Sequence, residues 1–239
     1  MKKLLFINAI LALSLSSLHA QKDNWHKKRI SPTLFENYMS LPQDKNVKNG
    51  AYNVANVDNK VLVLGSYKNN VKDSIWNFYN TTGDIIQSYN YSTNQMLYHV
   101  VDPSTIVKQK VVIDTTLSED DKIVAPQKIG GVNYGFYLIH SDKALPVEVK
   151  QQKNDILMEY VFSLSETGKL TDWHIVYTST FFNDDRKQSI SGLPKDAYEF
   201  TAATVNGKPI KSVLIYQVML YVNQARDKGT YNVVTQQNQ

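Results

Sequence analysis

Four short runs of β-branched and aromatic residues follow one another in the middle of the chain, and turn-forming residues separate each run from the next. The runs cover residues 60–67, 74–79, 85–91 and 96–101. Asn69, Asn70 and Gly83 lie between them, and these residue types accept the backbone angles that tight turns require. Because consecutive runs of this kind pair through their backbones, the sequence predicts an antiparallel β-meander over residues 48–101.

The second half of the chain combines strand patterns with helical patterns. Strands are predicted at residues 156–164 and 170–180, and a third at 213–222 near the end of the sequence. Apolar spacing predicts a helix at 132–141, and the capping residue Asn183 with the acids that follow it predicts another at 183–190. The expected fold class is therefore α+β, with the meander followed by a three-stranded antiparallel sheet and two helices.

The remaining segments are polar, and we expect them to connect or extend these two units. Residues 21–47 are interpreted as a polar leader, with a short helix at 32–41 because its largest apolar residues fall at helical spacing. Residues 102–125 are interpreted as a linker in which 107–113 have the pattern of one more strand, and residues 224–239 are interpreted as a polar tail. The second unit is expected to span residues 126–223.

The first twenty residues have the pattern of a secretory signal peptide. Lys2 and Lys3 precede an apolar run over residues 4–18, and Ala20 ends an acceptable cleavage site. The run is shorter than the roughly 20 apolar residues of a membrane span. We therefore expect cleavage near Ala20, a periplasmic or secreted protein, and no stable membrane span in the mature chain. Retention of the segment as an anchor is the alternative.

Charge and composition narrow the classes of function. The 26 basic and 22 acidic residues give a net charge of +4, and loss of Lys2 and Lys3 leaves +2. This nearly balanced charge lacks the basic excess that is typical of nucleic-acid-binding proteins, so we expect no nucleic acid to bind. The absence of cysteine excludes disulfides, thiolate metal sites and cysteine nucleophiles.

No arrangement of residues typical of catalysis is present in the sequence. The histidines at positions 26, 99, 140 and 174 fit no zinc-protease motif, and neither a serine-hydrolase elbow nor a phosphate loop occurs. Three consecutive acids at 119–121 lack the spacing of a calcium loop and are interpreted as a solvated turn. The sequence therefore predicts a protein that is not an enzyme and has no cofactor and no metal site.

The meander resembles the MORN-type repeats of bacterial YwqK-like proteins. Such repeats place a glycine and a tyrosine before a polar turn, then an aromatic cluster and a second glycine turn. The residues that match are Gly65, Tyr67, Trp76, Phe78, Tyr79 and Gly83. The resemblance implies an aromatic hairpin unit, and an antitoxin-like, immunity-like or structural envelope protein is the alternative function that it suggests.

Residues 126–223 resemble the C-terminal domain of TonB proteins. The order of prolines, glycines, aromatic residues and turns agrees over this whole segment. The matching residues are Pro126, Gly130, Gly131, Pro146, Phe162, Gly168, Leu193, Pro194, Phe200, Ala202 and the turn at 206–209. TonB energy transducers also have a retained anchor and a long proline-rich spacer. Here the signal peptide is expected to be cleaved and the sequence has few prolines and no such spacer, so we do not expect energy transduction.

The resemblance implies that the last strand pairs with an extended segment of another protein, such as an outer-membrane protein or a peptide strand. In such strand addition, backbone hydrogen bonds give affinity and alternate side chains give selectivity. The residues expected to bind the partner are Val213, Ile215, Tyr216, Val218 and Leu220. The sequence thus predicts an exported, non-enzymatic protein-interaction module, and the same pairing between two copies would give a homodimer.

Overall fold

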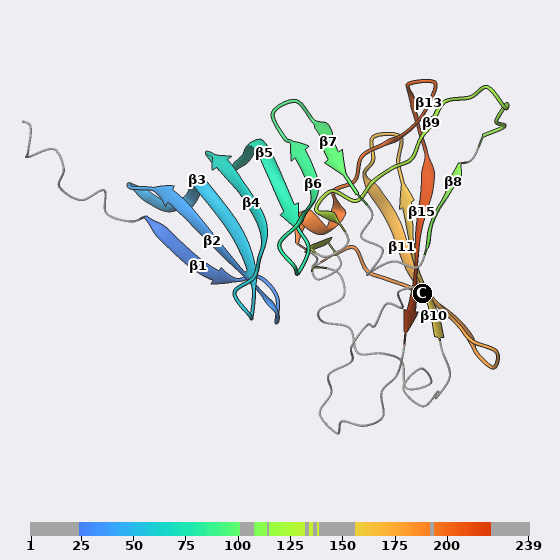
Figure 1. Ribbon diagram of the computed structural model, residues 1–239, viewed down its shortest axis with the longest axis horizontal. Coiled ribbons are helices and arrows are strands. Elements are labelled where there is room, and N and C mark those ends of the chain that lie inside the picture. Colours follow the sequence, from blue (N-terminus) through green and yellow to red (C-terminus); the bar gives the residue numbers. More distant parts are fainter. Residues whose placement is uncertain are drawn as a thin grey trace, which may run out of the picture.

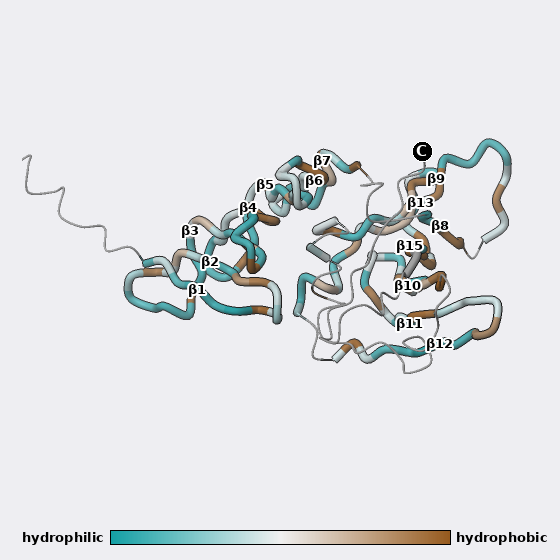
Figure 2. The backbone as a smooth tube through the Cα atoms, turned by 60° about the horizontal axis from the view of Figure 1, so that its bottom comes forward, coloured by the Kyte–Doolittle hydropathy of each residue, from teal (hydrophilic) through white to brown (hydrophobic). Residues whose placement is uncertain are grey.

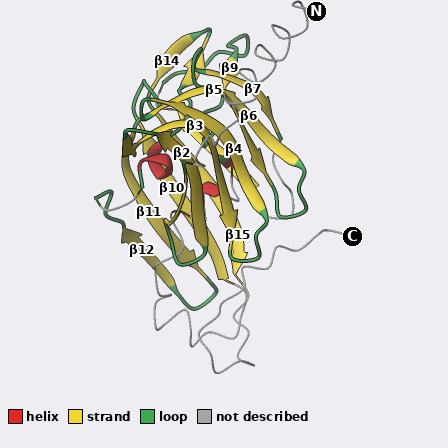
Figure 3. Ribbon diagram, turned by 90° about the vertical axis from the view of Figure 1, so that its left-hand side faces the viewer, coloured by secondary structure: helices red, strands yellow, loops and turns green. Residues whose placement is uncertain are grey.

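The computed structural model describes residues 24–100, 108–113, 115–131, 134–135, 138, 156–191 and 194–220. In these residues the chain forms three antiparallel β-sheets, and Figure 1 shows the first sheet beside a second β-rich unit. Figure 3 shows how little of this architecture is helical.

The first sheet, sheet A, has seven strands that follow sequence order, so each pairs with its neighbours along the chain. The strands are β1 (Trp25–Arg29), β2 (Leu34–Leu41), β3 (Asp44–Asn56), β4 (Val61–Lys68), β5 (Val71–Tyr79), β6 (Ile85–Asn90) and β7 (Gln95–His99). Asn69 and Asn70 connect β4 to β5 with positive φ at both positions, which is typical of two-residue hairpin turns. The four predicted runs coincide with β4 to β7.

The second sheet, sheet B, has five strands in the order β12-β11-β10-β15-β8. Its strands are β8 (Lys108–Ile113), β10 (Ile156–Leu164), β11 (Leu170–Thr178), β12 (Asn183–Lys187) and β15 (Ser212–Leu220). A small third sheet joins β9 (Ile123–Val124), β13 (Ala203–Val205) and β14 (Lys208–Ile210). The predicted strands at 156–164, 170–180 and 213–222 correspond to β10, β11 and β15.

The predicted α+β class is wrong, because the described residues are nearly all β and contain no helix of seven or more residues. Residues 183–187 form the edge strand β12 instead of a helix, in register with β11. Residues 183–189 have no apolar stripe that a helix could bury, whereas pairing with β11 satisfies their backbone groups. The capping signal at Asn183 therefore did not decide the structure.

Two other helical expectations have different outcomes. The helix predicted at 32–41 is wrong, because β2 occupies this segment between β1 and β3. Of the helix predicted at 132–141, the described residues Tyr134, Gly135 and Leu138 are helical, and the others lie outside the described residues. A second short helix, the 3-10 helix η2 (Lys195–Tyr198), follows Pro194.

The short helical segments lie between sheet A and sheet B and contact both. On the side of sheet A, Tyr134 stacks on Phe78 of β5 with ring centroids 6.1 Å apart. On the side of sheet B, Phe200, which follows η2, packs against Phe162 of β10 at 5.2 Å. The apolar core is therefore continuous from one sheet to the other, with η2 in the middle layer.

Within sheet A, aromatic side chains from β3 to β6 form one packed row. Trp76 is fully buried and lies 5.1 Å from Tyr52 and 5.2 Å from Tyr67. The Trp76 ring lies directly over Gly65, where a Cβ atom would meet ring carbons at 2.3–2.4 Å. Gly65 is required because it leaves room for this ring, and this contact explains the glycine–tryptophan pattern of the sequence.

We expect Gly65→Ala to lower the free energy of unfolding by about 1–3 kcal/mol, because the added methyl group would overpack the sheet against Trp76. Urea denaturation followed by circular dichroism measures the change. Trp76→Leu removes the ring, so Gly65→Ala should cost much less in that background. An equal cost in both backgrounds would contradict the packing explanation.

Candidate functional site

The strand expected to bind a partner, β15, lies inside sheet B, with a strand on each side. It pairs along its whole length with β10, from Leu164↔Ser212 to Ile156↔Leu220. On its other side it pairs with β8, from Ile113↔Ser212 to Lys108↔Gln217. The edge at which we expected an external strand is thus occupied over residues 212–217 by a segment of the same chain.

The two faces of β15 differ in burial, which the sequence did not reveal because both faces are apolar. Leu214, Tyr216 and Val218 are buried in the core, and the Tyr216 ring packs edge-on against Phe162 at 6.2 Å. Val213 and Ile215 lie on the opposite face and are half-buried. Leu220 is placed by its backbone pairing with Ile156, and its side chain lies outside the described residues.

The occupying strand β8 is held mainly through its backbone. Gln109, Val111 and Ile113 face the core side and are only half-buried, while Lys108, Lys110 and Val112 are exposed. Figure 2 shows the hydrophobic end of β8 at the margin of the molecule. On the outer face the Lys110 ammonium lies 3.7 Å from the Glu159 carboxylate, which also accepts a hydrogen bond from Gln217.

A second candidate site is the cleft where sheet A meets η2, with a volume of about 550 Å³. We call it the interface cleft. Sheet A and its turns contribute Ile30, Glu36, Lys48, Tyr52, Tyr67, Asn70, Val71, Lys72, Tyr91 and Asn94, and the facing side contributes Tyr134, Pro194, Lys195, Asp196 and Glu199. Aromatic walls with charged groups at a boundary between units are typical of binding sites.

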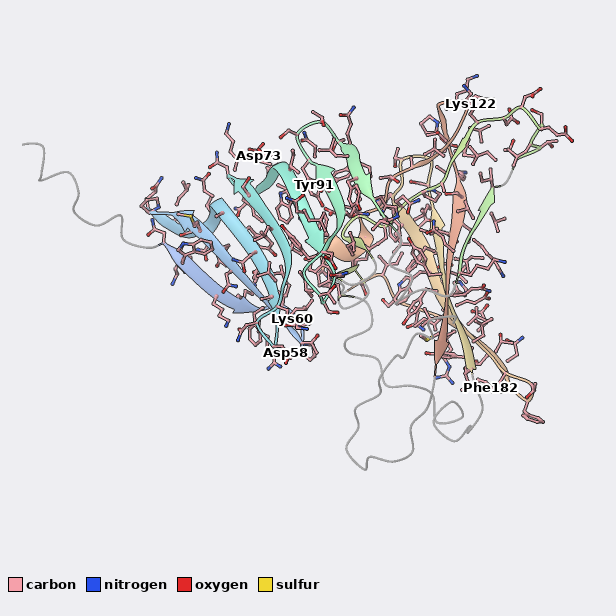
Figure 4. All side chains as sticks on the ribbon, in the orientation of Figure 1. Asp58, Lys60, Asp73, Tyr91, Lys122 and Phe182 are labelled. Atoms are coloured by element: carbon pink, nitrogen blue, oxygen red, sulfur yellow. The ribbon has the colours of Figure 1, made fainter. Side chains whose placement is uncertain are left out.

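Lys72 connects the two sides of the interface cleft. Its ammonium group lies 2.8 Å from Asp196 and donates to Glu199 at 2.7 Å and to the Tyr91 hydroxyl at 3.1 Å. It also lies over the Trp76 and Tyr91 rings, at 4.9 and 4.6 Å from their centroids. Figure 4 labels Tyr91, which lies just after β6 on the side of sheet A that faces η2.

The carboxylates of Asp196 on η2 and of Glu199, which follows η2, are fixed by further hydrogen bonds. Tyr91 donates to Glu199 at 2.6 Å, and Tyr134 donates to Asp196 at 2.8 Å. Burial alone would raise the pKa of Asp196, but the attraction of Lys72 lowers it below its usual value. Burial and the nearby carboxylates raise the pKa of Tyr91 and Tyr134, so both hydroxyls remain protonated donors.

A similar arrangement lies at the other end of the interface cleft. Glu36 is buried and accepts hydrogen bonds from Lys48 and from the Tyr52 hydroxyl, the latter at 3.1 Å. The Lys48 ammonium lies about equally close to three tyrosine rings, at 4.9–5.2 Å from the centroids of Tyr38, Tyr52 and Tyr67. The rings and carboxylates of this cleft thus hold the protein's own ammonium groups, which favours a structural role in joining the two units.

Lys128 lies behind the η2 carboxylates and is only 2% exposed. Its ammonium donates to the backbone carbonyls of Ile129 at 2.7 Å, Asp196 at 2.6 Å and Glu199 at 3.2 Å. Burial lowers the pKa of Lys128 from 10.5 to about 8, against the attraction of the nearby carboxylates. The protonated lysine therefore fixes η2 at a cost in desolvation.

This pKa predicts a pH dependence of stability. Between pH 8 and 10.5 the unfolded chain keeps the Lys128 proton while the folded protein loses it, so this group raises the free energy of unfolding as pH rises. The full gain is about 3 kcal/mol. We therefore subtract the free energy of unfolding of Lys128→Met from that of the natural protein. This difference should rise by roughly that amount from pH 8 to pH 10.5.

Urea denaturation at several pH values tests this expectation. Comparing the two proteins at each pH cancels the tyrosines, whose ionisation above pH 10 acts on both. A difference that stays constant from pH 8 to 10.5 would contradict the lowered pKa of Lys128.

The acidic residues around His174 and in the turn at 118–121 have local structural roles. Asp185 on β12 bonds Nδ1 of His174 on β11 at 2.8 Å, and Asp172 bonds Nε2 at 3.1 Å. Both hydrogen bonds raise the pKa of His174, and the bond to Asp185 has the larger effect. Asp121 accepts bonds from the Ser118 amide at 2.7 Å and from Asn206 at 2.6 Å, which closes the acidic turn. The described residues include no group of three potential ligands arranged for a metal ion.

We expect nuclear magnetic resonance titration to give His174 a pKa above 6.5. Replacing Asp185 with Asn removes the first cause of this shift, so the pKa of His174 should fall toward 6.5 in that variant. The natural protein, titrated under the same conditions, is the reference. An unchanged His174 pKa in the variant would show that Asp185 does not hold the proton.

The residues of the interface cleft were not identified from the sequence. Lys72 and Glu199 lie 127 positions apart, and no motif joins them. The only signal in the sequence was the interruption of aromatic strands by charged residues, such as Glu36 between Phe35 and Tyr38.

Comparisons of the chain with protein-family profiles, curated proteins and solved structures found no match. In the described part of the chain, no helix is both long and apolar enough to cross a membrane.

Proposed function

We propose that this chain is an exported, non-enzymatic protein-interaction module that binds an extended segment of a partner protein beside β15. The observation that supports this proposal is the pairing of β15 with β8, a strand from a distant part of the chain. The pairing is antiparallel and continuous over residues 212–217. Such an edge can accept a partner strand because its backbone groups are already aligned for pairing.

The burial of β15 also supports a role in binding. Its core face is fixed by Leu214, Tyr216 and Val218, and β10 holds its other edge along nine paired residues. This side of the sheet is therefore a rigid template, and a partner strand meets it without ordering β15 first. A pre-ordered template reduces the entropic cost of binding.

Selection from a library of short peptides against the mature chain tests the proposal, followed by hydrogen–deuterium exchange of the protein with each selected peptide. We expect the exchange changes to lie along β15 and its outer edge, at residues 108–113 and 212–217. Changes confined to the interface cleft, or the absence of any selected peptide, would contradict strand addition. A peptide with proline at alternate positions is the matched control, because proline cannot donate backbone hydrogen bonds.

A further inference from the structure

We propose that β8 is an exchangeable occupant of the β15 edge, and that the partner strand displaces it by presenting the same pattern of residues. This inference rests on the proposed function and adds to it the regulation of the site and the chemistry of its ligand. The strand β8 then limits binding to segments that compete with it.

The two neighbours of β15 are attached very differently. On one side, β10 pairs at nine positions and buries five side chains, Ile156, Met158, Tyr160, Phe162 and Leu164. On the other side, β8 pairs at six positions and none of its side chains is buried. Because hydrophobic burial is the main favourable term in packing, β8 is held far more weakly than β10.

Its position in the sheet also leaves β8 held from one side only. It is the last strand of sheet B, and no described strand pairs with its outer edge. A strand of this kind opens at lower cost than the sheet as a whole, because its removal exposes few buried contacts. The edge of β15 is therefore the place where sheet B can exchange one strand without losing its core.

The register of β8 specifies the ligand that fits. Val111 lies opposite Leu214 and Ile113 lies opposite Ser212, both toward the core. Lys110 lies on the outer face, 3.7 Å from the Glu159 carboxylate. A competing strand needs a basic residue at the position of Lys110, apolar residues one and three positions later, and an antiparallel direction relative to β15.

The probe is a fluorescent peptide with the sequence KQKVVI, which copies residues 108–113, placed between flexible Gly-Ser ends. Its binding is measured by anisotropy with the full mature chain and two variants. Val111→Asp weakens β8 on the core side, whereas Val112→Asp changes the adjacent side chain, which is 53% exposed. We expect Val111→Asp to bind the peptide about tenfold or more tightly than the natural chain, since more of the edge is free. Val112→Asp should bind the peptide with the same affinity as the natural chain.

A disulfide variant tests the same point without weakening the fold. Val112 and Val213 lie directly opposite each other, and the chain has no other cysteine, so Val112→Cys with Val213→Cys can lock β8 in place. We expect the oxidised protein to bind no peptide and the reduced protein to recover binding. Circular dichroism of each variant confirms that it is folded.

The outcomes separate this inference from the proposed function. Equal peptide binding by the natural chain, Val111→Asp and the oxidised disulfide variant would overturn the exchange of β8 and leave strand binding elsewhere on the sheet intact. Absence of binding to every folded variant, including the reduced disulfide variant, would overturn both. As a control, a peptide with Asp in place of its first valine should bind neither the natural chain nor Val111→Asp.

Discussion

The buried ammonium group of Lys128 is the contact on which the arrangement of the two halves depends. It donates to the carbonyls of Asp196 and Glu199, so the backbone of η2 is fixed and both carboxylates face sheet A. Lys72 then closes the connection from the other side. Removing Lys128 would take a donor from three backbone carbonyls, and removing Lys72 would leave the Asp196 and Glu199 carboxylates without its positive charge, which is costly in a medium of low polarity.

This fixed middle layer gives the two sheets different roles. Sheet A is a continuous meander with an aromatic row around Trp76, and its Phe78 stacks on Tyr134 of the helical segments. Sheet B has its rigid part at β10 and β11 and its least buried strands, β8 and β12, at its margins. Binding by strand exchange therefore concerns the margin of sheet B and leaves the connection between the sheets unchanged.

The strands of sheet A were predictable where neighbouring segments pair with each other. The runs at 60–101 became β4 to β7 because each strand meets the next after a short turn, so local pattern and tertiary pairing agree. The helix at 183–190 was predicted wrongly because Asn183 and its acids satisfy a capping rule that operates within one turn. Pairing with β11 outweighed that signal. The segment expected to be a linker contains β8, whose pairing with β15 could not be inferred from its six residues.

The sequence by itself determined the turns, the alternation of apolar residues and the places that require glycine. Asn69-Asn70 and Asn206-Gly207 both form two-residue turns with positive φ, and Gly65 leaves room for Trp76, because these effects involve neighbouring residues or a directly paired strand. Only the tertiary structure decided that β8 lies beside β15 and that Lys72 meets Asp196 and Glu199. Turn and strand preferences act over a few neighbouring residues, so they do not specify which distant segments pair. That pairing depends on the surfaces that the folded chain brings together.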